Sequence, residues 1–469
     1  MDASRQPACH LEFLRWRQAP LRVSTFAEVS TVSQLLDRAD RRLFRALTPA
    51  RLAWFHSPRT LVLGFVAIHV VFLLVLLPTI LTGNVLGDLP LYRTWAENGL
   101  VHHLWQGIDV EWVYPIGAIV PIAFAALAGP LLYQLLWFLM TMSLNAIAVA
   151  VLTDRGRDAR GYRAAWLWLL LSFVLSPVGL LRLEGLTAPL VITGLVLLAR
   201  RPIVAATLLT AATWIKVWPA AVMLAVVTVS SRRKVVAVTG AVMSAGVALM
   251  VWAAGGIRFL TGFVTMQSDR ALQLEAPVTT PWVWLAVSGR PDTAIYQNYA
   301  IATREVAGPG TAAVAEVMTP LMFLMIAAVL TLMLVGLRRR SDPALLLLLG
   351  SLALVGSFIV FNKVGSPQYM LWLVPIVVVG ASRAWRQWRA PVYLMLGISV
   401  LTTLIFPVFY LPLVDGDPFA VLLLTVRNAL LVVMLGWSVL ALAGLVRSTP
   451  RAPGLGARSG ARTVAARHG

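Results

Sequence analysis

Charged residues are scarce in this chain of 469 residues: Asp, Glu, Lys and Arg make up 13%, against about 25% in soluble domains. Hydrophobic residues make up 59%, and the mean hydropathy is +0.80. These values exclude an ordinary soluble enzyme and a disordered or fibrous chain. Long apolar runs recur from Leu61 to Val446, without the polar–apolar alternation of a transmembrane β-barrel. The sequence therefore predicts a polytopic, helical membrane protein.

Cysteine, lysine and nucleotide-binding motifs are also rare or missing. Cys9 is the only cysteine, so the chain cannot form an intrachain disulfide. No group of cysteines and histidines has the spacing of a zinc site, and no Rossmann-type glycine motif is present. We expect no metal and no other cofactor, although a divalent cation between Asp88 and Glu111 stays open as an alternative.

Arginine, by contrast, is abundant, and its distribution is informative. Basic residues outnumber acidic residues by 39 to 20, and the formal net charge is +19. The basic residues stand in short clusters between apolar runs, which is the positive-inside pattern of membrane proteins. This pattern explains the charge without a nucleic-acid partner. The clusters include residues 200–201, 232–234, 338–340 and 383–389.

The apolar runs and basic clusters divide the chain into three parts. Residues 1–60 are polar and arginine-rich, and we expect a cytoplasmic segment there rather than a cleaved signal peptide. Residues 61–446 form the predicted membrane domain. Residues 447–469 are basic and rich in Ala, Gly and Pro, so we expect a disordered cytoplasmic tail. The protein is accordingly expected in the plasma membrane, with both termini inside.

About twelve helices are expected to cross the membrane, since a span needs about 20 apolar residues. The run at 116–128 is interpreted instead as a short re-entrant or interfacial helix, because this keeps the arginines at 155–163 in the cytoplasm. The expected fold is an all-α bundle with loops and short helices on its outer face. The predicted spans are 61–82, 131–153, 164–182, 186–199, 203–213, 217–230, 235–254, 312–337, 342–361, 368–382, 391–411 and 419–446.

This topology places polar residues from distant parts of the chain on the outer face. Lys216 and Arg427 stand out, because a charge inside an apolar run needs a counter-charge or a phosphate. Other residues have an ordinary alternative: Arg182 and Glu184 can pair with each other at a turn, and Arg270 can be a solvated loop charge. The sequence therefore predicts a polar site at the outer membrane boundary.

Four polar motifs follow one another along this face: Asp-Leu-Pro-Leu-Tyr at 88–92, Glu-Trp-Val-Tyr-Pro at 111–115, Asp-Arg-Ala-Leu-Gln-Leu-Glu at 269–275 and Lys-Val-Gly-Ser-Pro-Gln-Tyr at 363–369. In this order they resemble the polyprenyl-phosphate-dependent glycosyltransferases of the GT-C superfamily. The nearest branch is glycosyltransferase family 87, which includes actinobacterial α-mannosyltransferases of lipoglycan synthesis.

The motifs depart from the family pattern at several positions. Ile116 replaces the second proline of the family's Tyr-Pro-Pro element, and Ala271 and Ala276 stand where Gly and Ser are usual. The tryptophan-containing motif with paired histidines, found in some mannosyltransferase members, is absent. The resemblance therefore supports membership of the family more directly than it supports mannose as the transferred sugar.

The resemblance implies an inverting membrane glycosyltransferase without a nucleotide-binding domain. Its donor would be a polyprenyl-phosphate-linked sugar, most simply mannose, and its acceptor a lipid-linked or glycan hydroxyl on the extracytoplasmic face. GT-C enzymes hold a catalytic acidic residue just after the first span, which implies that Asp88 is the general base. The donor phosphate would be held by Arg270, with Lys216, Lys363 and Arg427 as further candidates. The expected sugar and acceptor pocket comprises Tyr92, Glu111, Tyr114, Glu184, Gln273, Glu275, Gln368 and Tyr369.

Two alternatives remain at this point. Within the enzyme class, the donor can be a prenyl-phospho-arabinose, which would make the protein an arabinofuranosyltransferase. In a different class, the protein can be a polytopic transporter or lipid flippase. That class favours internal repeats and charges at the bilayer midplane, whereas this sequence has no convincing repeat and its charges collect on one face.

Overall fold

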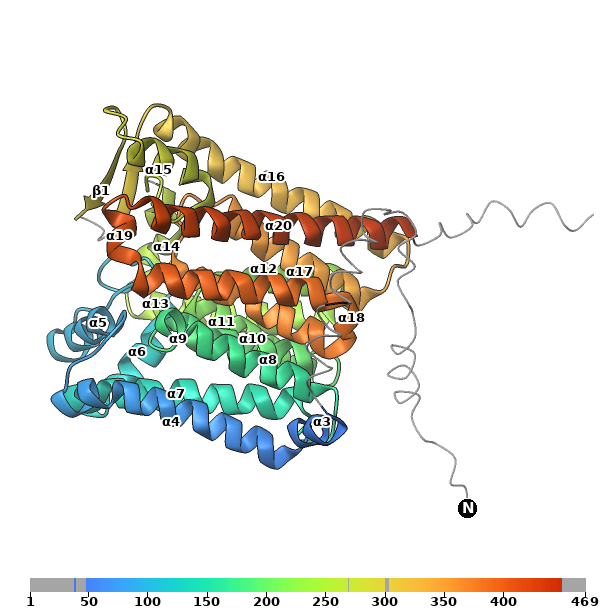
Figure 1. The fold of residues 1–469 in the computed structure, drawn as a ribbon. Coiled ribbons are helices and arrows are strands. Elements are labelled where there is room, and N and C mark those ends of the chain that lie inside the picture. Colours follow the sequence, from blue (N-terminus) through green and yellow to red (C-terminus); the bar gives the residue numbers. More distant parts are fainter. Residues whose placement is uncertain (1–37, 39–47, 269, 300–302, 449–469) are drawn as a thin grey trace, which may run out of the picture.

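The computed structural model describes residues 38, 48–268, 270–299 and 303–448, and most of this part of the chain is helical (Figure 1). The segments predicted as a cytoplasmic head and a disordered tail lie largely outside the described residues. Their predicted state therefore stays a prediction.

The first half of the described chain forms eleven helices and one short 3-10 helix. Several of them have proline at the first or second position, where its fixed φ suits the first helical turn. The elements are α3 (Pro49–Phe55), α4 (Pro58–Thr82), α5 (Leu89–His102), η1 (Ile116–Ala118), α6 (Ile119–Ala126), α7 (Gly129–Leu152), α8 (Gly161–Val174), α9 (Ser176–Gly179), α10 (Leu183–Leu197), α11 (Pro202–Ile215), α12 (Pro219–Val229) and α13 (Arg233–Ala253).

The second half contains the remaining long helices and a small β-hairpin. Its elements are η2 (Ile257–Phe259), α14 (Gly262–Ser268), η3 (Pro277–Thr279), α15 (Thr280–Val287), β1 (Ala294–Asn298), β2 (Thr303–Ala307), α16 (Thr311–Arg338), α17 (Pro343–Val360), η4 (Pro367–Tyr369), α18 (Met370–Thr403), η5 (Leu404–Val408), α19 (Tyr410–Val414) and α20 (Pro418–Ser448).

Seven helical segments of the described chain are long and apolar enough to cross a membrane. They are α4, α7, α13, α16, α17, α20 and the segment from η4 through α18 to η5. The helices α8, α10, α11 and α12 are apolar but have only 11 to 15 residues. At a rise of 1.5 Å per residue they are shorter than the hydrocarbon core of about 30 Å. The predicted count of about twelve spans therefore stays a prediction.

Two details of the predicted topology have a clear counterpart. The run predicted as a short helix at 116–128 forms η1 and α6, and its re-entrant placement stays a prediction. The spans predicted at 368–382 and 391–411 both lie largely on α18. This helix bends at Ala384, whose φ of −149° and ψ of 72° are not helical, so two helical segments meet there.

The long helices run between two ends of the bundle (Figure 1). We name one the loop end, because it carries α5, α6, α14, α15, the β-hairpin and α19. The other is the arginine end, where the turns after α7, α10 and α16 contain Arg155, Arg200 and Arg339. The segments that the sequence placed on the outer face therefore gather at one end of the molecule.

The core lies around α17, which is hydrophobic on every side and packs against α12, α16, α18 and α20. A helix with this pattern is buried on every side in a large bundle. On α4, in contrast, Leu63, Val66 and Leu74 are exposed. Exposed aliphatic side chains on a helix of this length are expected where it faces lipid.

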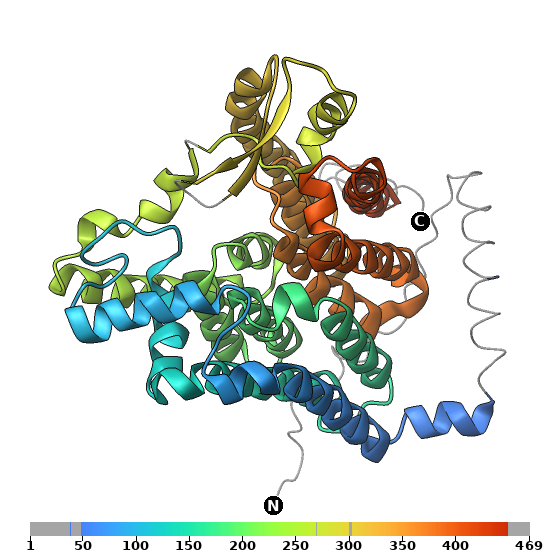
Figure 2. The ribbon, with the colours of Figure 1, turned by 60° about the vertical axis from the view of Figure 1, so that its left-hand side comes forward.

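A β-hairpin adds a feature that the sequence did not predict. Strands β1 and β2 pair antiparallel, with Ala294 opposite Ala307 and Asn298 opposite Thr303. Figure 2 shows the hairpin beside α15 and the start of α16, away from α5. The buried carboxylate of Glu305 accepts hydrogen bonds from Tyr296 and Asn298, which ties the two strands together. The predicted long outer segment at 255–311 is therefore largely ordered.

Candidate active site

The polar site is built at the loop end from segments that are far apart in the sequence. Asp88 comes from the start of α5, Arg182 and Glu184 from the start of α10, and Lys216 from the break between α11 and α12. The loops at 270–276 and 361–369 and the first half of α20 complete it. The sequence predicted this convergence of segments.

Asp88 stands at the N-terminus of α5, yet its side chain makes no capping hydrogen bond to that helix. Gly87 precedes it with φ of +65°, and an added Cβ there would also press against Leu181 at 3.3 Å. A glycine is therefore required for this turn. The turn leaves the Asp88 carboxylate 24% exposed and directed at Arg182, whose Nε lies 3.1 Å from Oδ1.

Arg182 connects three segments through one guanidinium group. Besides the contact with Asp88, its Nη1 donates a hydrogen bond to Gln368 Oε1 at 2.5 Å. Its Cζ lies 5.3 Å from the centre of the Phe406 ring, in a cation–π arrangement. The residue is 8% exposed, so the guanidinium is almost withdrawn from water.

Glu184 and Lys216 form a second, deeply buried ion pair. The Lys216 Nζ lies 3.1 Å from Glu184 Oε1, and the two residues are 8% and 0% exposed. The same Nζ lies 4.1 Å from the centre of the Tyr114 ring. Lys216 reaches this position because α11 ends there with extended backbone, three residues before Pro219 starts α12.

Glu275 and Arg427 form a third contact in the site. Arg427 is 1% exposed, and its Nη2 donates a hydrogen bond to the backbone oxygen of Glu275 at 2.6 Å. Burial raises the pKa of the Glu275 carboxyl to about 7, against an ordinary value of 4.5, although the charges of Arg427 and Arg182 partly oppose the shift. Arg182 is thus near both Glu275 and Asp88.

The two loops that carry the later motifs are joined to each other. Gln273 Oε1 accepts a hydrogen bond from the amide of Gly365, and the amide of Gln273 donates to the Lys363 oxygen, both at 2.9 Å. A Cβ at Gly365 would collide with the backbone of Ala276, so the loops approach as closely as their backbones allow. The amide oxygen of Gln273 is thus used to hold the loops together.

The remaining predicted residues divide between the centre and the rim of the site. Tyr92 is buried, and its hydroxyl lies 3.4 Å from Asp88 Oδ2. Tyr369 stacks on Trp372, with 3.9 Å between the ring centres. Glu111 is exposed and accepts a hydrogen bond from Thr265, so it lies at the rim. Lys363 is buried, and Arg270 is partly buried. Asp269, the first residue of its motif, lies outside the described residues.

The electrostatics of the site make Asp88 a more basic carboxylate than an exposed aspartate. Burial raises the pKa of Asp88 above its usual value, and the nearby Glu184 carboxylate acts in the same direction. The charges of Arg182 and Lys216 and the Tyr92 hydroxyl lower the pKa and offset part of this effect. A carboxylate with raised basicity suits proton abstraction near neutral pH.

Several buried polar atoms in the site have no hydrogen-bond partner among the described residues. The donors are Nε of Arg182, Arg270 and Arg427, and the acceptors are both Glu184 carboxylate oxygens and Glu275 Oε1. Two of these atoms are nevertheless ion-paired: Arg182 Nε lies 3.1 Å from Asp88 Oδ1, and Glu184 Oε1 lies 3.1 Å from Lys216 Nζ. Buried polar groups are normally paired. The remaining donors, Nε of Arg270 and Arg427, suit an oxyanion, and the remaining acceptors, Glu184 Oε2 and Glu275 Oε1, suit hydroxyl groups.

Arg182 is the residue that sequence reasoning missed. The sequence allows it to pair with Glu184 two residues later, but in the structure Arg182 pairs with Asp88 and Glu184 pairs with Lys216. The signal in the sequence was a pair of charges beside an apolar run. The described residues contain no group of three or more His, Cys, Asp or Glu side chains arranged to hold a metal ion. The expectation of a cofactor-free site stays a prediction.

Apolar helices around a cluster of buried, incompletely paired charges define a helical membrane protein with a polar site at one end. The model of glycosyltransferase family 87 matches residues 112–360, more than half of the chain, and the chain belongs to this family. It is therefore a membrane glycosyltransferase, and the family and enzyme class predicted from the sequence are confirmed. No curated protein and no solved structure matches the chain.

The matched region contains part of the site. Arg182, Glu184 and Lys216 lie within residues 112–360, as do the residues of the loop at 270–276. Asp88 precedes the matched region, and Arg427 follows it. The structure brings these outer segments to the matched part of the chain through the Asp88–Arg182 and Arg427–Glu275 contacts.

Proposed function

We propose that the protein transfers a sugar, mannose in the first place, from a polyprenyl-phosphate donor to a lipid-linked or glycan hydroxyl. One observation carries this proposal: the cations and carboxylates of the loop end converge in a site where several buried donors and acceptors have no hydrogen-bond partner among the described residues. Such a site complements a phosphate joined to a sugar, because one part of the ligand needs cations and the other needs hydrogen-bond acceptors.

Cations outnumber carboxylates in the site, which favours an anionic ligand. The cations are Arg182, Lys216, Arg270, Lys363 and Arg427, and the carboxylates are Asp88, Glu184 and Glu275. We assign the donor phosphate to Arg270, assisted by Lys216, Lys363 and Arg427. Because these cations can neutralise the phosphate, the reaction as proposed needs no metal ion.

In the proposed reaction Asp88 acts as the general base. It takes the proton of the acceptor hydroxyl while that oxygen forms a bond to the anomeric carbon. The bond from the anomeric carbon to the phosphate oxygen breaks, and the polyprenyl phosphate leaves with the electron pair. Because one displacement inverts the anomeric centre, a β-linked donor gives an α-linked product.

The residues around Asp88 are proposed to bind the sugar and the acceptor. Glu184 and Glu275 provide acceptors for hydroxyl groups, and Tyr92 and Tyr114 provide aromatic surface. Gln368 contacts Arg182, and Tyr369 stacks on Trp372. Gln273 supports this pocket by joining its loops, and Glu111 is placed at the entrance.

We further propose that the loop end faces the extracytoplasmic side of the plasma membrane. The support is the gathering of basic turns at the opposite end, since arginines near span ends favour the cytoplasm. Cysteine labelling in intact cells tests this orientation, with Cys9 replaced by Ser. The exposed Tyr299→Cys should react with an impermeant maleimide, and the exposed Arg157→Cys should react only after lysis. The reverse pattern would contradict the orientation.

A donor assay with purified protein tests the reaction. We expect sugar transfer from short-chain polyprenyl-phospho-mannose, with one polyprenyl phosphate released per sugar transferred. Transfer from polyprenyl-phospho-arabinose alone would support the arabinofuranosyltransferase alternative, which needs the same phosphate site. Transfer from a nucleotide sugar in the absence of any lipid-linked donor would contradict the proposal.

A further inference from the structure

Arg182 is the only described cation whose guanidinium contacts both Asp88 and the loop at 361–369. We infer that Arg182 is a positioning residue that holds Asp88 in its reactive orientation during sugar transfer; this rests on the proposed function. The ion pair with Asp88 at 3.1 Å and the hydrogen bond to Gln368 at 2.5 Å use two different nitrogens of one rigid group. One guanidinium group therefore bridges Asp88 and Gln368.

The chemistry of arginine suits this task better than that of lysine. A guanidinium is planar and presents donors in fixed directions, whereas an ammonium group is a point charge on a flexible stem. A third segment contributes the Phe406 ring, whose centre lies 5.3 Å from Arg182 Cζ and which packs against the guanidinium group. Asp88 itself sits at the end of a short helix and is not fixed by a capping bond. Its orientation thus depends on contacts made by its carboxylate.

The charged and titratable groups that face Asp88 determine what the loss of Arg182 would do. They are Arg182 and Glu184 from α10, Lys216 from the α11–α12 break and Tyr92 from α5. Lys216 is engaged by Glu184 at 3.1 Å, so the two largely compensate each other. Among these groups Arg182 lowers the pKa of Asp88 most strongly. Its removal should therefore raise the pKa of Asp88 further.

The experiment compares Arg182→Gln and Arg182→Lys with the wild type over a pH series. We expect Arg182→Gln to lower kcat by about 100-fold, as for a misplaced reacting group. It should also move the acidic limb of kcat/KM to higher pH, while the donor KM changes little. Arg182→Lys should restore the position of the limb, because it keeps the charge, but not the rate. A higher donor KM with an unmoved limb would overturn the inference, because Arg182 would then bind the phosphate.

A second measurement does not depend on turnover. Infrared titration of the carboxyl band, taken as the difference between wild type and Asp88→Asn, reports the protonation of Asp88 directly. The midpoint should rise in Arg182→Gln, and an unchanged midpoint would overturn the inference. Arg270→Gln serves as the control, for which we expect a higher donor KM and no shift in this midpoint. If the wild type is active but the Asp88 midpoint does not shift in Arg182→Gln, only the role of Arg182 is contradicted. If the wild type does not transfer sugar, the proposed function itself is contradicted.

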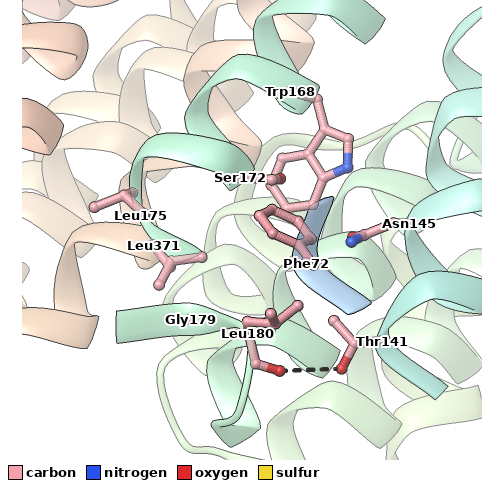
Figure 3. Close-up of a pocket in the computed structure, with 10 residues that line it drawn as sticks. Phe72, Thr141, Asn145, Trp168, Ser172, Leu175, Gly179, Leu180 and Leu371 are labelled. Carbon is pink, nitrogen blue, oxygen red and sulfur yellow. Dashed lines mark hydrogen bonds between the residues drawn. The ribbon is translucent and has the colours of Figure 1, made fainter. Parts of the chain in front are cut away.

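A separate observation concerns a small cavity of about 20 Å³ between α4, α7 and α8 (Figure 3). Its lining includes Phe72, Asn145, Trp168 and Ser172, and also Leu180, two residues before Arg182. Asn145 Oδ1, Trp168 Nε1 and Ser172 Oγ are buried without a hydrogen-bond partner among the described residues. One cavity therefore brings an acceptor, a donor and a hydroxyl together.

We infer that this cavity binds a single structural water. One water needs about 10–15 Å³ and two to four polar partners. The cavity has this volume, and three polar atoms without a hydrogen-bond partner among the described residues belong to its lining residues. Trp168 would donate to the water, which would donate to Asn145, with Ser172 as the third partner. The amide nitrogen of Asn145 already lies 3.4 Å from His69 Nε2, so its oxygen remains for the water.

Ser172→Val distinguishes a hydrated cavity from a dry one. In a hydrated cavity the valine expels the water and leaves Asn145 and Trp168 unpaired, so the thermal midpoint in detergent should fall. In a dry cavity the added methyl groups fill space, and a rise in the midpoint would overturn the inference. Ser143→Val on the exposed side of α7 controls for the effect of valine on helix propensity. A structure that resolves ordered waters should show one within hydrogen-bond distance of the three atoms, and its absence would also contradict the inference.

Discussion

The two ends of the bundle carry ion pairs of the same kind in opposite surroundings. At the arginine end, Arg200 and Asp154 approach to 3.4 Å, and their side chains are 56% and 48% exposed. At the loop end, Lys216 and Glu184 approach to 3.1 Å, and their side chains are 10% and 0% exposed. Exposed pairs remain solvated and contribute little, whereas buried pairs lose their hydration and depend on each other. The number of charges is thus less informative about function than their burial.

The comparison separates two uses of arginine in one chain. The exposed basic turns at one end suit a role in orientation within the membrane. At the other end, the guanidinium groups of Arg270 and Arg427 each retain a buried Nε donor without a hydrogen-bond partner among the described residues. A protein that only needed stability would gain little from such groups, since well-packed apolar residues are often at least as stabilising. Their retention is what a ligand-binding site requires.

Removing one carboxylate at each end should produce the largest difference. Glu184→Gln leaves Lys216 buried and unpaired, and we expect a loss of about 3–5 kcal/mol in stability. Asp154→Asn breaks the exposed pair, and we expect less than about 1 kcal/mol. The difference is measured from thermal midpoints or denaturant titration in the same detergent. Equal losses of stability for Glu184→Gln and Asp154→Asn would contradict the distinction between a buried and an exposed ion pair.

The pH dependence of stability should be dominated by the loop end. The pKa of Glu275 is raised to about 7 in the folded protein, against 4.5 for an ordinary glutamate. Between these two pH values, the carboxyl group is protonated in the folded protein and ionised in the unfolded chain. The contribution of this group to the free energy of unfolding is fully present below about pH 4.5 and is lost as the pH rises through about 7. Relative to wild type, Glu275→Gln should therefore gain up to about 3 kcal/mol between pH 5 and pH 8. A parallel pH dependence of the two proteins would show that Glu275 does not hold this proton.

The smallest effect is expected for a carboxylate with a purely local role. Asp342, next to the arginine-rich turn, caps α17 by accepting hydrogen bonds from the amides of Ala344 and Leu345. Asp342→Ala should cost about 1 kcal/mol of stability, as for other helix caps. The rate of sugar transfer per folded molecule should stay unchanged. A large loss of transfer would mean that the two ends do not divide these roles.

Much of the helical framework could be predicted from the sequence, because apolar runs are a local signal. The spans predicted at 61–82 and 312–337 correspond to Pro58–Thr82 and Thr311–Arg338. The number of crossings could not be settled in the same way, since α10, α11 and α12 are shorter than a span. The hairpin was missed because its two strands have only five residues each and lie in a polar segment.

The site was predictable in part. Lys216 and Arg427 stood out as charges within apolar runs, and the structure places both among buried polar partners. The role of Arg182 could not be found, because Gln368 is 186 positions away in the chain and no local pattern records such a contact. Glu111 belongs to a motif next to the site, yet it lies exposed beside Thr265. The sequence thus predicts which segments contribute to the site, whereas only the structure shows which of their side chains are buried in it.

The most direct test of the account compares sugar transfer by purified wild type and Asp88→Asn at equal amounts of folded protein. The substitution keeps the size of the side chain and removes its capacity to accept a proton. With a polyprenyl-phospho-sugar as donor, we expect the wild type to transfer the sugar and the variant to be about 10²–10⁴-fold slower, the usual contribution of a general base. Equal rates for the two proteins would contradict the assignment of the active site to the loop end.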